Sequence, residues 1–399
     1  MPTFELMDDV QGAVIKVIGV GGCGGNAVNH MIEQEVQGVE FVAINTDAQA
    51  LRNNKARTQL QIGSALTKGL GAGARPSVGQ AAAEEDRSRI ADMLEGVDMV
   101  FITAGMGGGT GTGAAPVVAQ IAKEKGILTV AVVTKPFGHE GKRKQFAQDG
   151  IEQLAQHVDS LIIVPNDKLM AVLGKNITLL DAFRASNSVL QGAVAGIAEI
   201  INVHGLVNPD FADVRTLMSE NGMAMMGSHT ATGTERAREA AEGAMASPLL
   251  EDVDLSGARG VLVNITASAD FTLGELDEVM QRVQEMAADD ATVIVGHVPD
   301  ENMGDALRVT IVATGLGLPA GRRQPKLEPV PGINMGMGTG TDGIPVIGDV
   351  DYSELEKPAI SRINALRSGR RQANETVEAM KQSGMSEEDI PTFLRIQAD

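Results

Sequence analysis

The sequence of 399 residues is poor in several residue types, and each shortage excludes a class of protein. Its single cysteine, Cys23, excludes an internal disulfide bond and a metal site built from several cysteines, and it fits a reducing compartment. No apolar run approaches the roughly 18 residues that a membrane-spanning helix needs, and residues 1–10 lack the pattern of a signal peptide. We therefore expect a cytoplasmic protein that does not insert directly into a membrane.

Positively charged residues are also scarce. The 33 Lys and Arg residues are outnumbered by 52 Asp and Glu residues, so the formal net charge is −19 at pH 7. Such an excess of negative charge disfavours binding to nucleic acid and direct attraction to an anionic membrane. The length suggests two folded domains plus extensions, and a hydrophobic content of 43% is sufficient for a substantial core.

Apolar runs alternate with helical patterns in the first half of the chain. We expect strands at 13–20, 39–47, 97–105, 126–134 and 159–166, separated by helices that include 26–34, 115–125 and 144–157. Such alternation is typical of parallel strands that are covered on both faces. The first half therefore predicts a doubly wound α/β domain.

The second half has a different pattern. A long apolar-periodic helix is expected at 178–203. It is followed by expected helices at 213–226, 234–246 and 273–287 and expected strands at 260–267, 291–298 and 307–316. Because these strands have fewer helices between them, we predict a smaller α+β domain. From about residue 319 the chain is rich in proline and glycine without a sustained period, as expected of a linker.

The segment GVGGCGGN at 19–26 follows an expected strand and opens an expected helix. Its glycines Gly19, Gly21 and Gly24 satisfy the pattern G-x-G-x-x-G, which allows backbone N–H groups to approach a diphosphate. The pattern alone leaves two alternatives open. It is also compatible with a tight turn without a ligand, or with a dinucleotide site in which Asp47 would bind the ribose.

A second segment, GMGGGTGTGAAP at 105–116, also joins an expected strand to an expected helix, which would begin at Ala114. Two such glycine segments at the ends of separate strands suit a longer phosphate chain that is held from both sides. Thr110 and Thr112 could add hydroxyl donors or hold a water bound to magnesium. No G-x-x-x-x-G-K-[ST] motif is present, so backbone amides, helix dipoles and a cation must balance the phosphate charge. A third glycine segment, 68–76, could cover the terminal phosphate or could be a surface turn.

The run GGGTGTG at 107–113 resembles the signature of the tubulin/FtsZ family, and most closely its bacterial cell-division branch. The likeness covers essentially residues 1–318 and 389–399. It includes NTDAQAL (45–51), TKPFGHEGK (134–142), DAFRASN (181–187), FADVRTLM (211–218), SPLLED (247–252) and DIPTFLRIQAD (389–399). The resemblance implies a self-assembling GTPase whose subunits stack head to tail into filaments of the bacterial division ring.

The resemblance also implies a domain organisation and a ligand. The fold would be a Rossmann-like, doubly wound GTPase domain joined by a long central helix to a smaller α+β domain. The implied segments are a GTP-binding domain (1–177), a connecting helix (178–204), an α+β domain (205–318), a flexible linker (319–385) and a partner-binding peptide (386–399). The ligand would be GTP or GDP with Mg2+, and K+ is a second candidate cation. No protein side chain is assigned as a direct metal ligand.

The implied nucleotide contacts differ in role. Glu140 and Arg143 would lie at the ribose and phosphate side, Asn26 and Asn187 would bond to guanine, and Phe183 would stack on it. The other implied contacts are Gly21, Gly22, Cys23, Gly24, Gly25, Asn45, Gly71, Gly73, Gly107, Gly108, Gly109, Thr110, Gly111 and Thr112. Taken alone, an asparagine in mid-helix such as Asn187 is more often simply solvated.

Three positions depart from the family pattern. Cys23 occupies a place where the family often has glycine, which introduces a thiol that reagents could modify. Arg75 stands where asparagine is usual in the loop for the terminal phosphate. The segment EGKRKQF at 140–146 is one residue shorter than usual, so either Arg143 or Lys144 could face the nucleotide.

The segment NPDFADV at 208–214 follows the long helix. Its plainest interpretation is a helix start, with a capping side chain, a proline and acids in the first turn. In the family this loop enters the nucleotide pocket of the next subunit. By resemblance, Asp210 and Asp213 would position the water that attacks the γ-phosphate, and Asn208 would support them. A cation is implied because carboxylates repel a triphosphate.

The terminal segment could be a frayed end or a short recognition helix. By resemblance, Ile390, Phe393, Leu394 and Arg395 would bind membrane-tethering and regulatory division proteins, which would hold the protein at the mid-cell division site. Two rival functions remain. A nicotinamide-dependent oxidoreductase would not need the second glycine segment, and a GTP-binding relative without hydrolysis would not need Asp210 and Asp213.

Overall fold

A computed structural model describes residues 12–174, 177–203, 207, 209–220, 222–247, 250, 258–288 and 291–316, apart from the side chains of 170–172, 179 and 286. The chain divides into two compact units, Met1–Gln324 and Pro325–Asp399, and every described residue belongs to the first. Asn208 and the predicted tail residues Ile390, Phe393, Leu394 and Arg395 lie outside the described residues.

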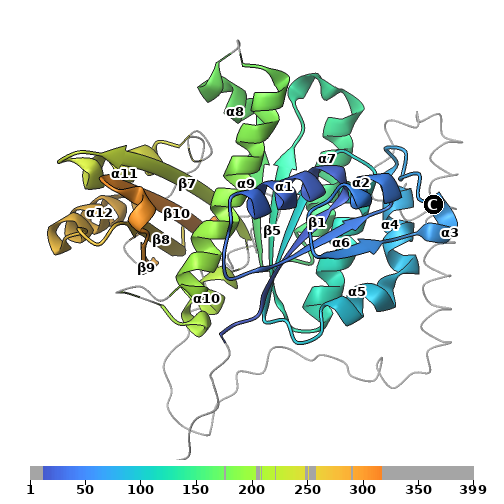
Figure 1. Cartoon of the computed structure of the whole chain (residues 1–399), viewed down its shortest axis with the longest axis horizontal. Helices are drawn as coiled ribbons and strands as arrows, with labels where there is room; N and C mark the ends of the chain where they lie inside the picture. Colours follow the sequence, from blue (N-terminus) through green and yellow to red (C-terminus); the bar gives the residue numbers. More distant parts are fainter. Residues whose placement is uncertain are drawn as a thin grey trace, which may run out of the picture. The chain divides into compact units, whose positions relative to one another are not determined.

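The described strands form one ten-stranded sheet in the order β3-β2-β1-β4-β5-β6-β7-β10-β8-β9 (Figure 1). The first six are β1 (Ile15–Val20), β2 (Glu40–Asn45), β3 (Thr58–Gln61), β4 (Met99–Gly105), β5 (Leu128–Lys135) and β6 (Ser160–Pro165). They pair in parallel throughout. After β1 the chain builds outward through β2 and β3, and it then returns to place β4 on the other side of β1. A reversal of this kind leaves a crevice at the carboxyl ends of the two strands, where ligands bind in open α/β sheets.

Helices cover both faces of these parallel strands. They are α1 (Gly21–Glu33), α2 (Ala48–Arg52), α3 (Ser64–Thr67), α4 (Pro76–Glu85), α5 (Arg87–Met93), α6 (Thr110–Glu124), α7 (Lys142–Leu154) and α8 (Asn166–Leu173). Side chains of β4 alternate between two cores: Phe101 packs with α1, and Ile102 packs with α6. The predicted doubly wound α/β fold is confirmed.

The long helix α9 (Leu179–Asn202) lies between the parallel strands and the second part of the sheet (Figure 1). Thr178 caps its start by accepting a hydrogen bond from the Asp181 amide at 3.1 Å. Small residues let the second part approach this helix, since a Cβ on Gly196 would lie 3.0 Å from Thr310 Cγ2. The predicted central helix is therefore packed on both sides.

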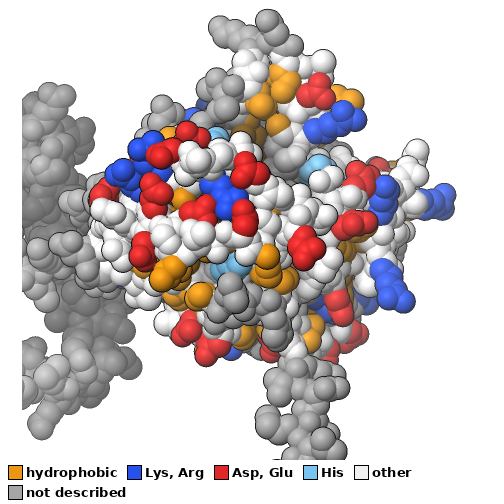
Figure 2. All heavy atoms as spheres, turned by 60° about the vertical axis from the view of Figure 1, so that its left-hand side comes forward, with side chains coloured by type: hydrophobic (Ala, Val, Ile, Leu, Met, Phe, Trp, Pro, Cys, Tyr) orange, Lys and Arg blue, Asp and Glu red, His pale blue; other side chains and the backbone are white. Residues whose placement is uncertain are grey.

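The second part contains β7 (Gly222–Thr232), β8 (Gly260–Ala267), β9 (Thr292–Pro299) and β10 (Ala306–Leu316), with the helices α10 (Phe211–Met218), α11 (Arg236–Met245) and α12 (Leu273–Met286). Strand β10 runs antiparallel to β7 and β8, which agrees with the predicted α+β class. Figure 2 shows a face on which acidic and basic side chains are interspersed, without a broad basic patch among the described residues.

One predicted element is wrong. A helix was expected to continue to residue 226, but α10 ends at Met218 and residues 222–232 form β7. The run GMAMM consists largely of methionine and alanine, which favour helices in isolation. In the fold, β7 lies between β6 and β10, so its backbone groups find strand partners on both sides. These tertiary hydrogen bonds outweigh the local preference.

A buried histidine lies on β9. His297 is 3% exposed and stacks on Phe271, with ring centroids 4.9 Å apart and planes 8° apart. Neither ring nitrogen has a hydrogen-bond partner among the described residues. Burial without a partner disfavours the charged ring and lowers the pKa of His297 below its ordinary value.

We expect His297 to destabilise the protein at acid pH. As the pH falls through about 6.5, the unfolded chain takes up a proton on this ring more readily than the folded protein, so stability is lost as the pH falls. Urea unfolding should show up to about 1 kcal/mol less stability at pH 5.5 than at pH 7 from this residue. The His297→Leu variant should lose less stability over that interval than the parent protein, and equal losses would contradict the assignment.

Candidate functional site

Two helices begin at the carboxyl ends of neighbouring parallel strands. Helix α1 begins at Gly21 directly after β1, and α6 begins at Thr110 shortly after β4. Both start earlier than the sequence predicts, because residues within the glycine segments already form the first helical turns. Neither start has a side-chain cap. The amides of both first turns therefore remain available to an anion, which the helix dipoles also favour.

The glycines are required because the two helix starts touch. A Cβ on Gly21 would lie 2.9 Å from the Gly111 amide nitrogen, and one on Gly111 would lie 2.7 Å from the Gly105 carbonyl oxygen. Similarly, a Cβ on Gly24 would lie 2.3 Å from the Thr103 carbonyl oxygen. Gly22 differs, since its Cβ would have no neighbour within 4 Å. The space beside Gly22 is therefore open to a ligand.

The third glycine segment, 68–76, packs against the start of α6. A Cβ on Gly109 would lie 2.8 Å from Ala72 Cβ and 2.9 Å from the Arg75 amide nitrogen. Gly71 and Gly73 take φ values of +87° and +59°, which favour glycine. The segment is therefore a shaped wall beside the two helix starts.

The two threonines of the second glycine segment are already engaged within the protein. The Gly107 amide donates to Thr112 Oγ1 at 2.8 Å, and Thr112 is 2% exposed. Thr112 therefore holds the glycine turn rather than facing open space. Thr110 Oγ1 lies 2.6 Å from Thr46 Oγ1, a residue that sequence reasoning did not single out.

Glu140 and Arg143 lie together beside the same turn. Glu140 Oε1 accepts a hydrogen bond from the Phe137 amide at 2.9 Å, and its other oxygen pairs with Arg143. Arg143 Nε donates to the Gly107 carbonyl at 3.4 Å, and its Nη2 lies 4.0 Å from the Cβ position of Gly108. Of the two side chains that the sequence leaves open, Arg143 is thus the one with contacts to the glycine turn.

The predicted guanine contacts come from α1 and α9. Phe183 and Asn187 are one helical turn apart on α9, and Asn26 lies on α1. Phe183 is 45% exposed, and its ring meets Phe137 edge to face with centroids 6.0 Å apart. A hollow of about 340 Å³ between the two helices is lined by Asn26 and Asn187. Asn26 and Asn187 therefore line one hollow, and Phe183 lies one turn before Asn187 on α9.

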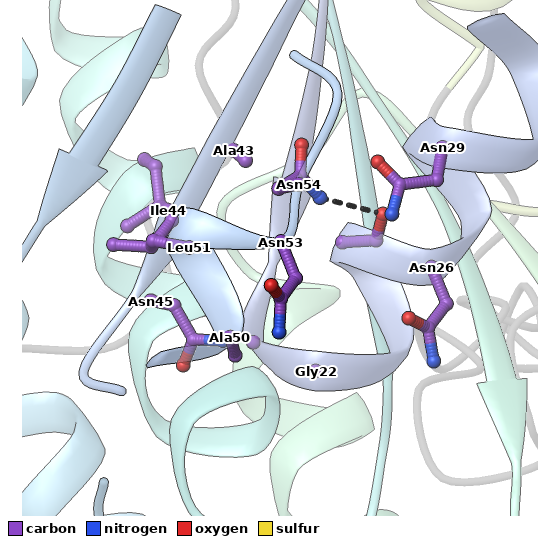
Figure 3. A pocket seen from close by; sticks show the side chains of 12 residues that line it. Gly22, Asn26, Asn29, Ala43, Ile44, Asn45, Ala50, Leu51, Asn53 and Asn54 are labelled. Atoms are coloured by element: carbon purple, nitrogen blue, oxygen red, sulfur yellow. Dashed lines mark hydrogen bonds between the residues drawn. The ribbon is translucent and has the colours of Figure 1, made fainter. Parts of the chain in front are cut away.

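A second hollow, of about 320 Å³, opens beside the start of α1 (Figure 3). Its lining includes the predicted contacts Gly21, Gly22, Gly25, Asn26 and Asn45. Figure 3 shows additional amide side chains around it: Asn29, Asn53 and Asn54. The Asn54 side chain donates to the Gly25 carbonyl at 2.9 Å. Sequence reasoning missed these three residues, although the concentration of asparagine in 26–54 was a usable signal.

The predicted acids lie elsewhere. Asp210 caps α10, and its carboxylate accepts a hydrogen bond from the Asp213 amide at 2.8 Å. Both residues are exposed. On the same helix, the Arg215 side chain donates to the Gly126 carbonyl at 2.7 Å, just before β5 begins. The acids therefore lie at the amino edge of the parallel strands, whereas α1 and α6 begin at the carboxyl edge.

Helix α9 separates the predicted nucleotide contacts from the predicted acids. Its 24 residues span about 36 Å, with Phe183 and Asn187 near the start and α10 after the end (Figure 1). The predicted nucleotide contacts and the predicted acids of one chain therefore cannot meet. Among the described residues, no group of three or more His, Cys, Asp or Glu side chains could hold a metal ion, and no helix could cross a membrane.

Comparison with known proteins identifies the family. Residues 14–174 match the Tubulin/FtsZ family, GTPase domain, and residues 222–317 match the FtsZ family, C-terminal domain. The chain is 57% identical to the cell division protein FtsZ of Coxiella burnetii over 98% of both chains. It is 55% identical to that of Azotobacter vinelandii, over 99% of this chain and all of the relative. The chain belongs to the FtsZ group of the tubulin/FtsZ family.

Solved FtsZ structures agree with this assignment. An FtsZ mutant from M. jannaschii is 46% identical with a TM-score of 0.74, covering 76% of this chain and 92% of that one. An empty FtsZ dimer from M. jannaschii is 43% identical with a TM-score of 0.74, covering 82% and 96%. CetZ1 from Haloferax volcanii, 20% identical with a TM-score of 0.67 over 76% and 94%, shares the fold.

Membership of the FtsZ group makes this chain a GTPase that binds guanine nucleotide. The rival prediction of a nicotinamide site is thereby excluded. The carboxylate that the sequence offered for a ribose also caps a helix. Asp47 caps α2, and its Oδ1 accepts hydrogen bonds from the Gln49 and Ala50 amides at 2.8 and 3.2 Å.

The thiol of Cys23 lies within this site. Its Sγ is 3.7 Å from Thr134 Oγ1, and a Cβ on Gly105 would approach it to 2.8 Å. Burial raises the pKa of Cys23, and the Thr134 hydroxyl and the Arg143 charge offset this only in part. Although the sequence suggested a thiol open to reagents, this environment favours the unreactive protonated form.

We expect Cys23 to react slowly with iodoacetamide near neutral pH. The alkylation rate, followed by mass spectrometry, should rise with a midpoint at a higher pH than that of a free thiol, because only the thiolate attacks and burial raises the pKa of Cys23. Free N-acetylcysteine serves as the reference, and the Cys23→Ser variant provides the blank. A midpoint at or below that of N-acetylcysteine would show that the site stabilises the thiolate instead.

Proposed function

We propose that this protein polymerises head to tail into filaments of the bacterial division ring and hydrolyses GTP at each junction between subunits. One subunit would bind GTP at the starts of α1 and α6. The next subunit would supply Asp210 and Asp213, with Asn208 supporting them. The observation that carries this proposal is the separation of the two half-sites by α9, which extends about 23 Å beyond Asn187 before it ends at Asn202. A contact that joins opposite ends of identical subunits is heterologous and produces a filament when it does not close.

Exposed apolar side chains at the nucleotide end support self-association. Leu70, in the segment that packs on Gly109, is 84% exposed, and Leu66 on the neighbouring α3 is 55% exposed. Leu180, one turn before Phe183 on α9, is 61% exposed. Covering such side chains with a second subunit is favourable in water. The solved FtsZ dimer from M. jannaschii shows that a relative associates with itself.

The chemistry would need little covalent participation by the protein. The glycine segments would hold the triphosphate with backbone amides, and the incoming carboxylates would position the attacking water. Mg2+ would neutralise charge on the triphosphate, with K+ as a further candidate near the carboxylates. Because the pocket presents amide side chains rather than clustered carboxylates, phosphate oxygens would be the main ligands of the metal.

The remaining nucleotide roles follow from position. Glu140 and Arg143 would contact the ribose and phosphates, Phe183 would stack on guanine, and Asn26 and Asn187 would bond to it. The C-terminal peptide 386–399 would recruit membrane-tethering and regulatory division proteins. The filament would thereby be held at the division site from the cytoplasm without direct insertion into the membrane.

The shared site predicts that turnover depends on assembly. Specific GTPase activity per subunit should rise steeply with protein concentration, because an isolated subunit lacks the acids that complete its pocket. A phosphate-release assay over a dilution series, with light scattering as the measure of assembly, tests this. Activity per subunit that stays constant on dilution would contradict the proposal.

Asp213→Asn should reduce turnover by about 10²- to 10³-fold and leave GTP bound, because it removes a charge that positions water. Two variants of Asp210 separate the effect of its charge from the effect of its role as a helix cap. Asp210→Asn keeps a good cap and loses the charge, whereas Asp210→Ala loses both and also costs about 1 kcal/mol of stability. If the charge matters for catalysis, both Asp210 variants should lose activity, but only Asp210→Ala should lower the melting temperature.

Mixing two inactive variants distinguishes shared from internal catalysis. Asp213→Asn keeps the pocket, and Phe183→Asp, at an exposed position, keeps the acids but repels the nucleotide. In a 1:1 mixture about one junction in four pairs an intact pocket with intact acids, so up to about a quarter of the parent activity should return. If the acids served their own subunit, the mixture would remain inactive.

A further inference from the structure

Thr46 is a fully buried residue at the point where three elements of the site meet. It follows β2, is 0% exposed, and has its Oγ1 at 2.6 Å from Thr110 Oγ1 at the start of α6. Its carbonyl oxygen accepts hydrogen bonds from the Thr67 hydroxyl at 3.2 Å and from the Gly71 amide at 3.3 Å. Thr46 thus contacts the start of α6 through its side chain and the segment 68–76 through its backbone.

The direction of the hydroxyl–hydroxyl bond decides what Thr110 can do. Each hydroxyl has one proton, and a contact of 2.6 Å between the two oxygens accommodates one proton. If Thr110 donates to Thr46, its only proton is used. If Thr46 donates instead, Thr110 keeps its proton for another acceptor. Thr110 is the first residue of α6, where the free amides face the proposed phosphate position.

A phosphate oxygen only accepts hydrogen bonds, so a bound nucleotide favours the arrangement in which Thr46 donates. Hydrogen bonds in series also strengthen one another in a buried site. We propose that Thr46 is a positioning residue that orients the Thr110 hydroxyl toward the phosphate chain of GTP. This inference rests on the proposed nucleotide pocket, but it does not require catalysis between subunits.

The side chain of Thr46 can be tested separately from its backbone bonds. Thr46→Val preserves the shape and the carbonyl contacts to Thr67 and Gly71 but removes the hydroxyl. Thr46→Ser keeps the hydroxyl and removes a methyl group. Binding should be measured on nucleotide-free protein, at concentrations below assembly, by fluorescence titration with a labelled GTP and by competition with unlabelled guanosine.

Thr46→Val should bind the labelled GTP about fivefold to tenfold more weakly, because a hydrogen bond to a charged group loses its orientation. Thr46→Ser should bind it within about twofold of the parent protein. Guanosine, which has no phosphate, should bind all three proteins equally. Unchanged GTP binding in Thr46→Val, or equal weakening of GTP and guanosine, would overturn the inference.

A double-mutant cycle supplies the decisive comparison. If Thr46 acts through Thr110, then Thr110→Val should weaken GTP binding, and adding Thr46→Val should weaken it no further. Additive losses would show that Thr46 acts independently. If Thr46→Val does not fold, Thr46→Ala removes the same hydroxyl and completes the same cycle. A parent protein that binds GTP no better than guanosine would instead refute the proposed pocket itself.

Discussion

The parallel alignment of the first six strands is the constraint on which the other features depend. Because these strands all point the same way, every helix that follows one of them begins at the same edge of the sheet. The starts of α1 and α6 can therefore lie side by side, and neither start has a side-chain cap. The same alignment sends α9 back across the sheet and places α10 at the opposite edge. The separation of the proposed nucleotide pocket from Asp210 and Asp213 is thus a property of the topology.

Close approach of the two helix starts explains the composition that distinguishes this sequence. A side chain on Gly21 would collide with the Gly111 amide and push the two helix starts apart, and one on Gly111 would collide with the Gly105 carbonyl at the end of β4. Thr112 and Thr46 then replace the missing side-chain contacts, one by holding the Gly107 amide and the other by bonding to Thr110. The glycines permit the geometry, and the buried hydroxyls maintain it.

Much of this was accessible from the sequence, for reasons that particular residues illustrate. The buried runs that became β1, β4 and β5 are apolar on both faces, and such runs predict parallel strands wherever they occur. Strand β7 was not accessible, because its methionines and alanines favour a helix until β6 and β10 supply partners.

The site shows the same limit. Glycine spacing predicts where a phosphate can approach, but the roles of Thr46, Asn54 and Thr112 depend on contacts between residues far apart in the chain. The sequence likewise leaves Arg143 and Lys144 as alternatives, and the contact of Arg143 with the Gly107 carbonyl is found only in the fold. The spacing of residues in the sequence identifies the segments that form a pocket. Which side chains bond to one another across that pocket is seen only in the folded structure.

The cap of α10 links stability to the proposed chemistry. The Asp210 carboxylate accepts a hydrogen bond from the Asp213 amide, so it is held in one orientation although it is exposed. When Asp210 and Asp213 of one subunit approach the triphosphate bound to the next, the like charges repel each other. The net charge of −19 on each subunit increases that repulsion. In the proposed filament, a cation and the burial of apolar side chains such as Leu70 must offset it. Assembly and nucleotide chemistry would then depend on the same contact between subunits, because the carboxylates of one subunit reach the pocket of the next only through it.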